Sequence, residues 1–137
     1  MKNCIFCKIV AGKSPCYKVY EDKSFLGFLD IYPRVKGHTL VIPKTHYKWT
    51  YDVLEYDKYW LVTLKLTKAL QKIFNTDWIT HFTYGAIPHA HIHILPRVAS
   101  ISREPSELDI VPPHINFSKE EMQEIAEKIS CELTNLS

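Results

Sequence analysis

The sequence predicts an α+β fold with a mostly antiparallel sheet, one main helix and a C-terminal helix. Three segments with strand-like alternation follow one another near the N-terminus with no helical pattern between them. Two long segments, at about 57–74 and 118–133, instead carry apolar residues at helical spacing. With 137 residues, 46% of them apolar and 23% charged, the chain is expected to form one domain over 1–137, its core at about 3–110.

The first three strands are predicted at residues 16–22, 24–30 and 38–44. A turn at "GKSP" precedes the first strand, and "YPRVKG" leads into the third. In the third strand His38, Leu40 and Ile42 share one face, because side chains alternate along a strand. Pro43 either ends this strand or marks it as an edge, since proline has no amide hydrogen to donate.

The main helix is predicted at about 57–74, where one apolar stripe runs from Val62 to Ile73, and "NTD" at 75–77 breaks it. Two further strands are expected at 78–84 and 89–95, joined by a short "GAIP" turn. Ser118 and Glu121 form a capping box at the start of the C-terminal helix. The stripe of that helix consists of Met122, Ile125, Ile129 and Leu133.

Composition restricts the class of protein. A net charge of +2 excludes neither a phosphate-bearing nor a neutral ligand, and it offers no case for nucleic-acid binding through bulk charge. No apolar run approaches the ~18 residues that a membrane helix needs. The N-terminus lacks the core and cleavage site of a signal peptide, so a cytoplasmic protein is expected. Four cysteines in that compartment are not expected to form disulfides.

Three of the seven histidines, His89, His91 and His93, occupy alternate positions in "PHAHIHILPR". On a strand they share one face, and the opposite face is apolar. That apolar face is expected to pack under the main helix, so the imidazoles are expected to point away from the core towards a cleft or a partner. The apolar face consists of Ala90, Ile92 and Ile94.

Strand geometry argues against one metal ion held by all three imidazoles. At ~3.3 Å per residue, the Cα atoms of His89 and His93 lie ~13 Å apart, whereas Zn–N bonds measure ~2.1 Å. Two neighbours sharing a metal, or one histidine joining distant ligands, remain open. A third option is a catalytic row with divided roles, because a neutral imidazole with a pKa of ~6.5 is a good nucleophile and base. His38 adds a fourth candidate to such a row.

Several motifs in order resemble the histidine triad (HIT) superfamily, in its bacterial-type Hint-like branch. They are "CIFCKIVAGKSP", "VYED", "FLDIYPRVKGHTLVIPKTH", "HAHIHILPR" and "FSKEEMQEIAEKI", and together they extend over residues 3–130. H-x-H-x-H alone has moderate specificity, but "GHTLVIPK" at the matching distance upstream makes the resemblance strong. The resemblance implies a HIT-like fold and a homodimer.

The resemblance also implies an enzyme, a nucleotidyl hydrolase or transferase that acts at the α-phosphate of nucleotide derivatives. Phosphoramidates or dinucleoside polyphosphates of a purine nucleoside are the implied substrates, and an AMP- or GMP-like nucleotide is the implied ligand. His91 would be the nucleophile that forms a nucleotidyl-histidine, which water then hydrolyses. His93 would orient or polarise the site, and His38 would flank it.

The nucleotide contacts implied by the resemblance include "FLDI". Asp30 would accept hydrogen bonds from the ribose hydroxyls, and Phe28 and Ile31 would form the wall for sugar and base. Phe6 would lie on the other side of the nucleotide, whose phosphate would meet His91 and His93. On pattern alone, Asp30 also has an alternative interpretation as a turn residue at a strand end.

A structural zinc site is also implied by the resemblance. C-x-x-C at Cys4 and Cys7 is followed by 38 residues, His46, 42 residues and His89. Two thiolates and two imidazoles suit a closed tetrahedral Zn²⁺ site. In the alternative interpretation, the cysteines are a reduced pair and His46 is merely exposed.

The loop before the triad departs from the family pattern. Relatives carry a glutamine or asparagine and often a serine that contact the phosphate, whereas "TYGAIP" has Gly85 and Ala86 at those places. The loss of one such donor typically costs ~10²–10³ in rate, unless backbone N–H groups, Thr83 or Tyr84 compensate. A nucleotide-binding module with little catalysis, a zinc-dependent hydrolase and a scaffold acting through a dimer surface therefore remain rival hypotheses.

Overall fold

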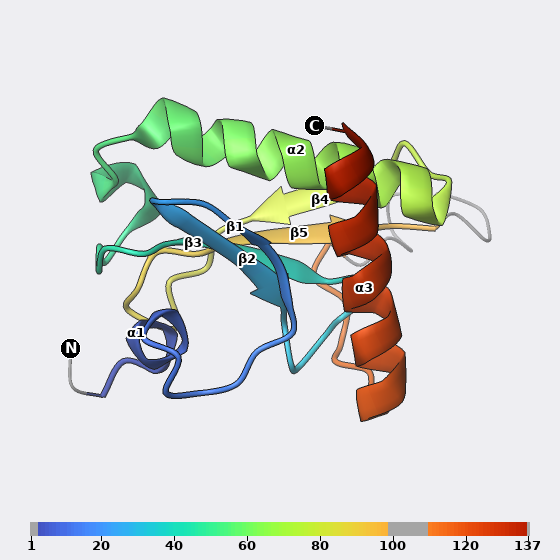
Figure 1. Cartoon of the computed structure of the whole chain (residues 1–137), viewed down its shortest axis with the longest axis horizontal. Helices are drawn as coiled ribbons and strands as arrows, with labels where there is room; N and C mark the ends of the chain where they lie inside the picture. Colours follow the sequence, from blue (N-terminus) through green and yellow to red (C-terminus); the bar gives the residue numbers. More distant parts are fainter. Residues whose placement is uncertain (1–2, 99–109, 137) are drawn as a thin grey trace.

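The fold was analysed in a computed structural model that describes residues 3–98 and 110–136. Five strands and three α-helices make up these residues, with one short 3₁₀ helix, η1, at Thr50–Asp52 (Figure 1). The helices are α1 (Ile5–Val10), α2 (Tyr56–Phe74) and α3 (Lys119–Leu136). The strands are β1 (Lys18–Glu21), β2 (Phe25–Leu29), β3 (Thr39–Pro43), β4 (Ile79–Phe82) and β5 (Ile92–Pro96).

The strands form one sheet in the order β1-β2-β3-β5-β4, and every neighbouring pair is antiparallel. The predicted α+β class with an antiparallel sheet is therefore confirmed. Pro43 ends β3, which lies in the middle of the sheet between β2 and β5, so it does not mark an edge. Within the described residues, no helix is long and apolar enough to span a membrane.

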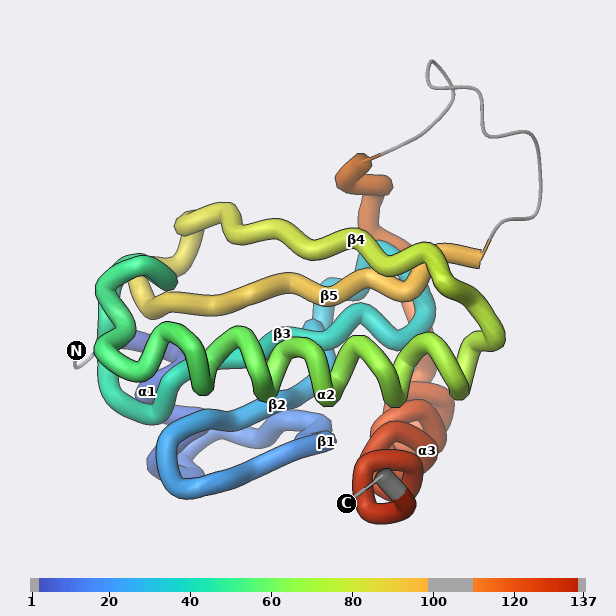
Figure 2. The backbone as a smooth tube through the Cα atoms, turned by 90° about the horizontal axis from the view of Figure 1, so that it is seen from above, coloured from blue at the N-terminus to red at the C-terminus, as the bar shows by residue number. Residues whose placement is uncertain are grey.

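The main core lies between one face of the sheet and helices α2 and α3. Seen from above, α2 runs along the direction of β3, β5 and β4, while α3 stands at one end of the sheet (Figure 2). Tyr59 of α2 is fully buried, stacks on Phe25 at 5.2 Å and donates a hydrogen bond of 2.8 Å to the Val41 carbonyl. The predicted apolar face of the triad segment joins this core through Ala90, Ile92 and Ile94.

Helix α1 covers the opposite face of the sheet, below it in Figure 1. Its Phe6 packs in a second cluster with Leu26 and Phe28 of β2 and with Leu40 and Ile42 of β3. This six-residue helix was not predicted, because it is too short to show a helical repeat. The Cys4 sulfur caps it by accepting a hydrogen bond from the Cys7 N–H at 3.3 Å.

Both predicted helix boundaries are explained by local hydrogen bonding. Asn75 ends α2 in the left-handed conformation, with φ of 48°, which asparagine tolerates better than most residues. At the start of α3, Glu121 N–H donates to the Ser118 hydroxyl at 3.1 Å and Ser118 N–H donates to the Glu121 carboxylate at 3.0 Å. The capping box is therefore confirmed.

The predicted strand over 89–95 is shorter in the structure, whereas its histidines lie away from the main core as expected. Strand β5 begins only at Ile92, and His89 lies in a bend before it. His89, His91 and His93 are 0, 5 and 9% exposed, so all three are buried. They do lie away from the main core, but α1 and Phe6 shield His89 and His91 from solvent.

Gly37 lies in the turn that leads into β3 and directly precedes His38. Its φ is +87°, and a Cβ at this position would lie 2.6 Å from Phe74 and 3.2 Å from Pro96. Only glycine satisfies both demands here, because other residues are strained at this φ and would overlap with the Phe74 ring.

We expect Gly37→Ala to lower the free energy of unfolding by about 2–4 kcal/mol, from the left-handed backbone and from overpacking together. Urea denaturation measures this loss. Gly12→Ala is the matched control, because Gly12 has a similar φ of +75° but no atom within 4 Å of its Cβ position. Equal losses in the two variants would contradict the packing argument.

Candidate functional site

A cavity of ≈ 500 Å³ opens between α1, the end of β2 and the triad segment. This volume is in the range of small-molecule binding sites, and most of the lining side chains are apolar. The residues predicted to bind a nucleotide all line it: Phe6, Phe28, Asp30, Ile31, His91 and His93.

His91 is held as a neutral imidazole with a defined tautomer. Its Nδ1 lies 2.8 Å from the His89 carbonyl oxygen, which can only accept, so Nδ1 carries the hydrogen. Nε2 therefore keeps its lone pair. Burial lowers the pKa of His91 below its ordinary value, partly opposed by the carboxylate of Asp30. A neutral imidazole nitrogen with a free lone pair is chemically able to act as a nucleophile.

His38 and His93 form a directed relay beside His91. The Arg34 backbone N–H donates to His38 Nδ1 at 3.1 Å, so neutral His38 must carry its hydrogen on Nε2. This Nε2–H donates to His93 Nδ1 at 2.9 Å, which places the hydrogen of His93 on its own Nε2. His93 Nε2 is one of two buried side-chain polar atoms without a partner in the described residues, so it is a free donor.

Burial keeps both histidines of the relay uncharged. Desolvation, aided by the positive charge of Arg34, lowers the pKa of His38 to about 3, and desolvation with His38 nearby lowers the pKa of His93 to about 3. The His93 ring also stacks on Phe82, with 4.2 Å between ring centroids and 14° between planes. The relay is therefore neutral and rigid near pH 7.

Asp30 has the role of a turn residue and also faces the site. One of its carboxylate oxygens accepts the Tyr32 backbone N–H at 2.9 Å, while the other lies 3.5 Å from His38 Nε2. Burial raises the pKa of Asp30 above its ordinary value. The carboxylate is thus positioned at the cavity with acceptor capacity to spare, because a carboxylate has about four lone-pair directions.

The four predicted metal ligands Cys4, Cys7, His46 and His89 come together at the start of α1. All four ligand atoms lie within 4.8 Å of one another. The Cys4 sulfur is 3.3 Å from His89 Nδ1, and the Cys7 sulfur is 3.2 Å from His46 Nδ1. Tetrahedral zinc with usual bond lengths separates sulfur and nitrogen ligands by about 3.6 Å, so these residues fit the ion.

Surrounding contacts also suit a metal. His89 Nε2 donates to the Pro43 carbonyl at 2.9 Å, which leaves Nδ1 as the lone-pair nitrogen towards both cysteines. Burial and the neighbouring Cys4 raise the pKa of the Cys7 thiol, so two thiolates here require a compensating cation. A second group, Asp30 with His38 and His93, also lies within 4.8 Å, but its two imidazoles are hydrogen-bonded to each other.

Some lining residues were not predicted from the sequence. Arg34, Tyr32 and His114 line the mouth of the cavity. Arg34 donates to the Pro112 carbonyl at 2.7 Å, and His114 Nδ1 donates to the Tyr32 carbonyl at 2.8 Å, so two segments about 80 residues apart are joined. No local pattern marks such residues, because only the tertiary fold brings the segments together.

Comparison with known proteins gives a consistent result. The HIT domain model matches residues 11–100. The adenosine 5′-monophosphoramidase hnt1 of Schizosaccharomyces pombe is 36% identical over 138 residues, covering 96% of this chain and 98% of the relative.

Two solved structures share the fold over almost their whole length. A Hit-like protein involved in cell-cycle regulation from Bartonella henselae superposes with a TM-score of 0.82 at 32% identity, covering 96% of this chain and 97% of that one. A Zn-bound histidine triad family protein from Mycobacterium smegmatis superposes with a TM-score of 0.78 at 29% identity, covering 98% and 96%. With its triad, sheet and domain match in agreement, the chain belongs to the HIT domain family.

Proposed function

We propose that the protein is a nucleotidyl hydrolase or transferase that acts at the α-phosphate of purine nucleotide derivatives through a nucleotidyl-His91 intermediate. One observation carries this proposal: two adjacent buried imidazoles line the cavity, one holding a nitrogen lone pair and the other an unpartnered N–H. Attack at phosphorus needs a nucleophile and a donor to the developing negative charge, and the pair supplies both. The similarity to a phosphoramidase supports the same reaction class.

In the first step, His91 Nε2 attacks the α-phosphorus and an N–P bond forms. The bond to the leaving group breaks with its electron pair, and the leaving group takes a proton from solvent. The imidazole gains positive charge, which the Nδ1–H bond to the His89 carbonyl stabilises. His93 Nε2–H donates to a phosphate oxygen.

In the second step, water attacks the same phosphorus. The N–P bond breaks, its electron pair returns to His91 Nε2, and the proton of the water goes to solvent. The product is a nucleoside 5′-monophosphate when water is the acceptor, and another nucleotide derivative when a second acceptor replaces water. His38 remains neutral throughout and acts as a positioning residue, because it touches His93 rather than the phosphate.

The nucleoside is assigned to the apolar part of the cavity. Phe6 was expected on the other side of the nucleotide from Phe28, but the two rings meet edge to face at 5.6 Å and form one wall, with the exposed Ile31 beside it. The Asp30 carboxylate accepts from the ribose hydroxyls. A purine such as adenine or guanine gains most from an aromatic wall, because its large ring system buries more apolar surface.

Zinc is proposed as a structural ion on Cys4, Cys7, His46 and His89. With four protein ligands the ion has no open position for activating water, which disfavours the zinc-dependent hydrolase. Its effect on the active site is indirect: it ties α1 to His89, whose carbonyl orients His91. The reduced thiols that such a site requires suit the cytoplasm.

A nucleotide-binding module with little catalysis is the second candidate, favoured by the missing amide in the loop before the triad. Gly85 carries no side chain that donates to phosphate, so part of the charge stabilisation must come from His93 and backbone N–H groups. The two candidates differ in one measurable respect, since only the enzyme forms a covalent nucleotidyl adduct.

A homodimer is proposed through β4 and α2. Strand β4 is an edge of the sheet, so one side of its backbone is unpaired and available to a second copy. Leu64 is 49% exposed on α2, whose Thr67 faces β4 through its 2.8 Å contact with His81. An exposed leucine beside an open strand edge favours association of two copies.

Turnover of adenosine 5′-phosphoramidate or of a dinucleoside polyphosphate tests the proposed reaction. We expect His91→Asn to lower kcat by at least about 10³-fold, because the nucleophile is lost. Mass spectrometry of quenched protein is expected to find the nucleotidyl adduct on His91. Leu54→Ala, at an exposed residue outside the cavity and outside β4 and α2, is the control. Equal rates for His91→Asn and wild type would refute the enzyme, and AMP binding without turnover would favour the binding module.

Metal analysis of the purified protein is expected to find one zinc ion per chain, and Cys7→Ser is expected to lose it. The free energy of unfolding should then fall by about 2.7 kcal/mol if free zinc stands at about a hundred times its dissociation constant. Cys131→Ser, at an exposed cysteine of α3, should keep both zinc and stability. Zinc retained in Cys7→Ser would rule out this ligand set.

Light scattering coupled to size exclusion tests the dimer. Leu64→Lys is expected to shift the protein towards monomer, because a charge would be buried against the partner. Ile5→Lys places the same charge on α1, on the other face of the sheet, and should leave the oligomeric state unchanged. A wild-type monomer, or an unaltered dimer of Leu64→Lys, would contradict the proposed interface.

A further inference from the structure

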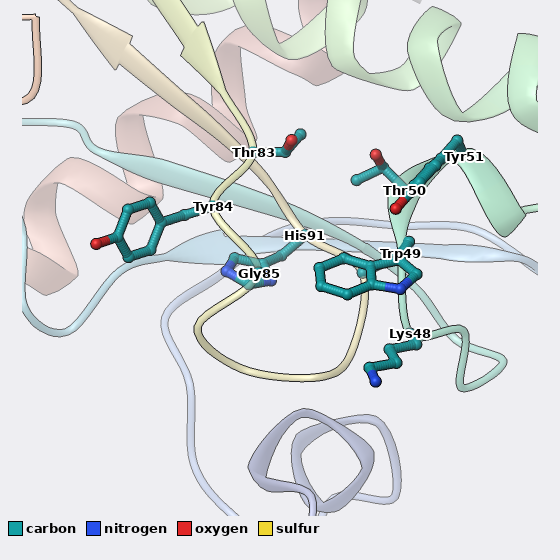
Figure 3. A pocket seen from close by; sticks show the side chains of 9 residues that line it. Lys48, Trp49, Thr50, Tyr51, Thr83, Tyr84, Gly85 and His91 are labelled. Carbon is teal, nitrogen blue, oxygen red and sulfur yellow. The ribbon is translucent and has the colours of Figure 1, made fainter.

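A second cavity, of ≈ 240 Å³, adjoins His91 and is separate from the nucleoside cavity (Figure 3). Lys48, Trp49 and Tyr51, from the connection between β3 and α2, form one side of it. The other side is the loop after β4, with Thr83 and Gly85. His91 and Tyr84 line both cavities, so the two meet at the proposed nucleophile.

The Trp49 indole occupies the space that a side chain at position 85 would need. A Cβ on Gly85 would lie 2.4 Å from Trp49 Cζ3, and the φ of +80° at Gly85 also favours glycine. The indole is thus the group beside His91 at the place where the loop carries no side chain, as Figure 3 shows. Gly85 and Trp49 form a matched pair that replaces a polar contact by an aromatic wall.

The chemistry of the lining selects a particular kind of ligand. Trp49 is 38% exposed, and its ring centroid lies 6.1 Å from that of Tyr51, so two aromatic rings are available for stacking. Lys48 lies with its ammonium 5.4 Å from the Trp49 ring centroid, and it is the one lysine, arginine or carboxylate among the lining residues. A flat aromatic group with a negative charge fits this combination.

We propose that this second cavity binds the leaving group, and that Trp49 and Lys48 make the enzyme prefer aromatic leaving groups that carry an anionic substituent. The inference rests on the proposed function, in which His91 attacks the phosphorus that joins nucleoside and leaving group. In an aromatic amidate, the P–N bond breaks as the His91–P bond forms, and the nitrogen departs with the electron pair and takes a proton from solvent.

Three adenosine 5′-amidates test the preference, with propylamine, 2-phenylethylamine and 4-(2-aminoethyl)benzoate as leaving groups. The three amines have similar basicity, so ratios of kcat/KM report binding rather than intrinsic reactivity. We expect Trp49→Ala to lower the aromatic-to-propyl ratio by about tenfold. Lys48→Met should lower the ratio of the benzoate to the phenyl substrate and leave the phenyl-to-propyl ratio unchanged. Leu54→Ala, at an exposed residue outside the cavity, is the matched control and should keep every ratio.

Calorimetry with free 4-(2-aminoethyl)benzoate separates ligand binding in the second cavity from the proposed reaction. Loss of its binding in Trp49→Ala supports the second cavity as its site even if wild type hydrolyses none of the amidates, in which case the proposed function fails alone. Turnover of all three amidates with ratios unchanged in Trp49→Ala would overturn the inference and leave the proposed function standing. Absence of both binding and turnover in wild type would overturn both.

Discussion

Helix α1 lies over the histidine face of the sheet, and the burial of His89 and His91 depends on this contact. Phe6 packs edge to face on His89 at 5.7 Å and on His91 at 5.2 Å, which removes both rings from solvent. A buried imidazole loses the hydration that stabilises its charged form, so it stays neutral. The Cys4 and Cys7 sulfurs at the start of the same helix face His89, which couples the proposed metal ligands to the triad.

Once the rings are neutral, backbone groups decide which nitrogen carries each hydrogen. The His89 carbonyl orients His91, and the Arg34 N–H orients His38 and, through it, His93. Neighbouring histidines thereby receive opposite roles, a lone pair on one and a donor on the other. Two backbone contacts thus determine which imidazole nitrogens donate and which accept. No charged side chain is needed in the relay for this purpose.

The loop before the triad shows how a departure from a family pattern changes a site rather than removing it. Gly85 brings no amide side chain to the phosphate, but it lets the Trp49 indole approach His91 from a distant segment. In the proposed reaction, charge stabilisation then depends more on His93, and the proposed site of the leaving group is aromatic. Gly85 lacks the amide side chain of the family pattern. The second cavity nevertheless requires this glycine, because a side chain at position 85 would overlap with the Trp49 indole.

Local pattern alone predicts the antiparallel sheet, the apolar face formed by Ala90, Ile92 and Ile94, and the helix boundaries at Asn75 and Ser118, because each depends on residues close in sequence. The resemblance to the HIT superfamily implied which side chains line the cavity beside α1 and which four cysteine and histidine side chains meet.

Only the tertiary structure decided that the triad is buried, that α1 covers it, and that Trp49 and His114 border the cavities. These features depend on contacts between segments some 40 to 80 residues apart, as the hydrogen bonds from His89 to Pro43 and from Arg34 to Pro112 illustrate. Such contacts leave no periodic trace in the sequence, since neither partner reveals the position of the other.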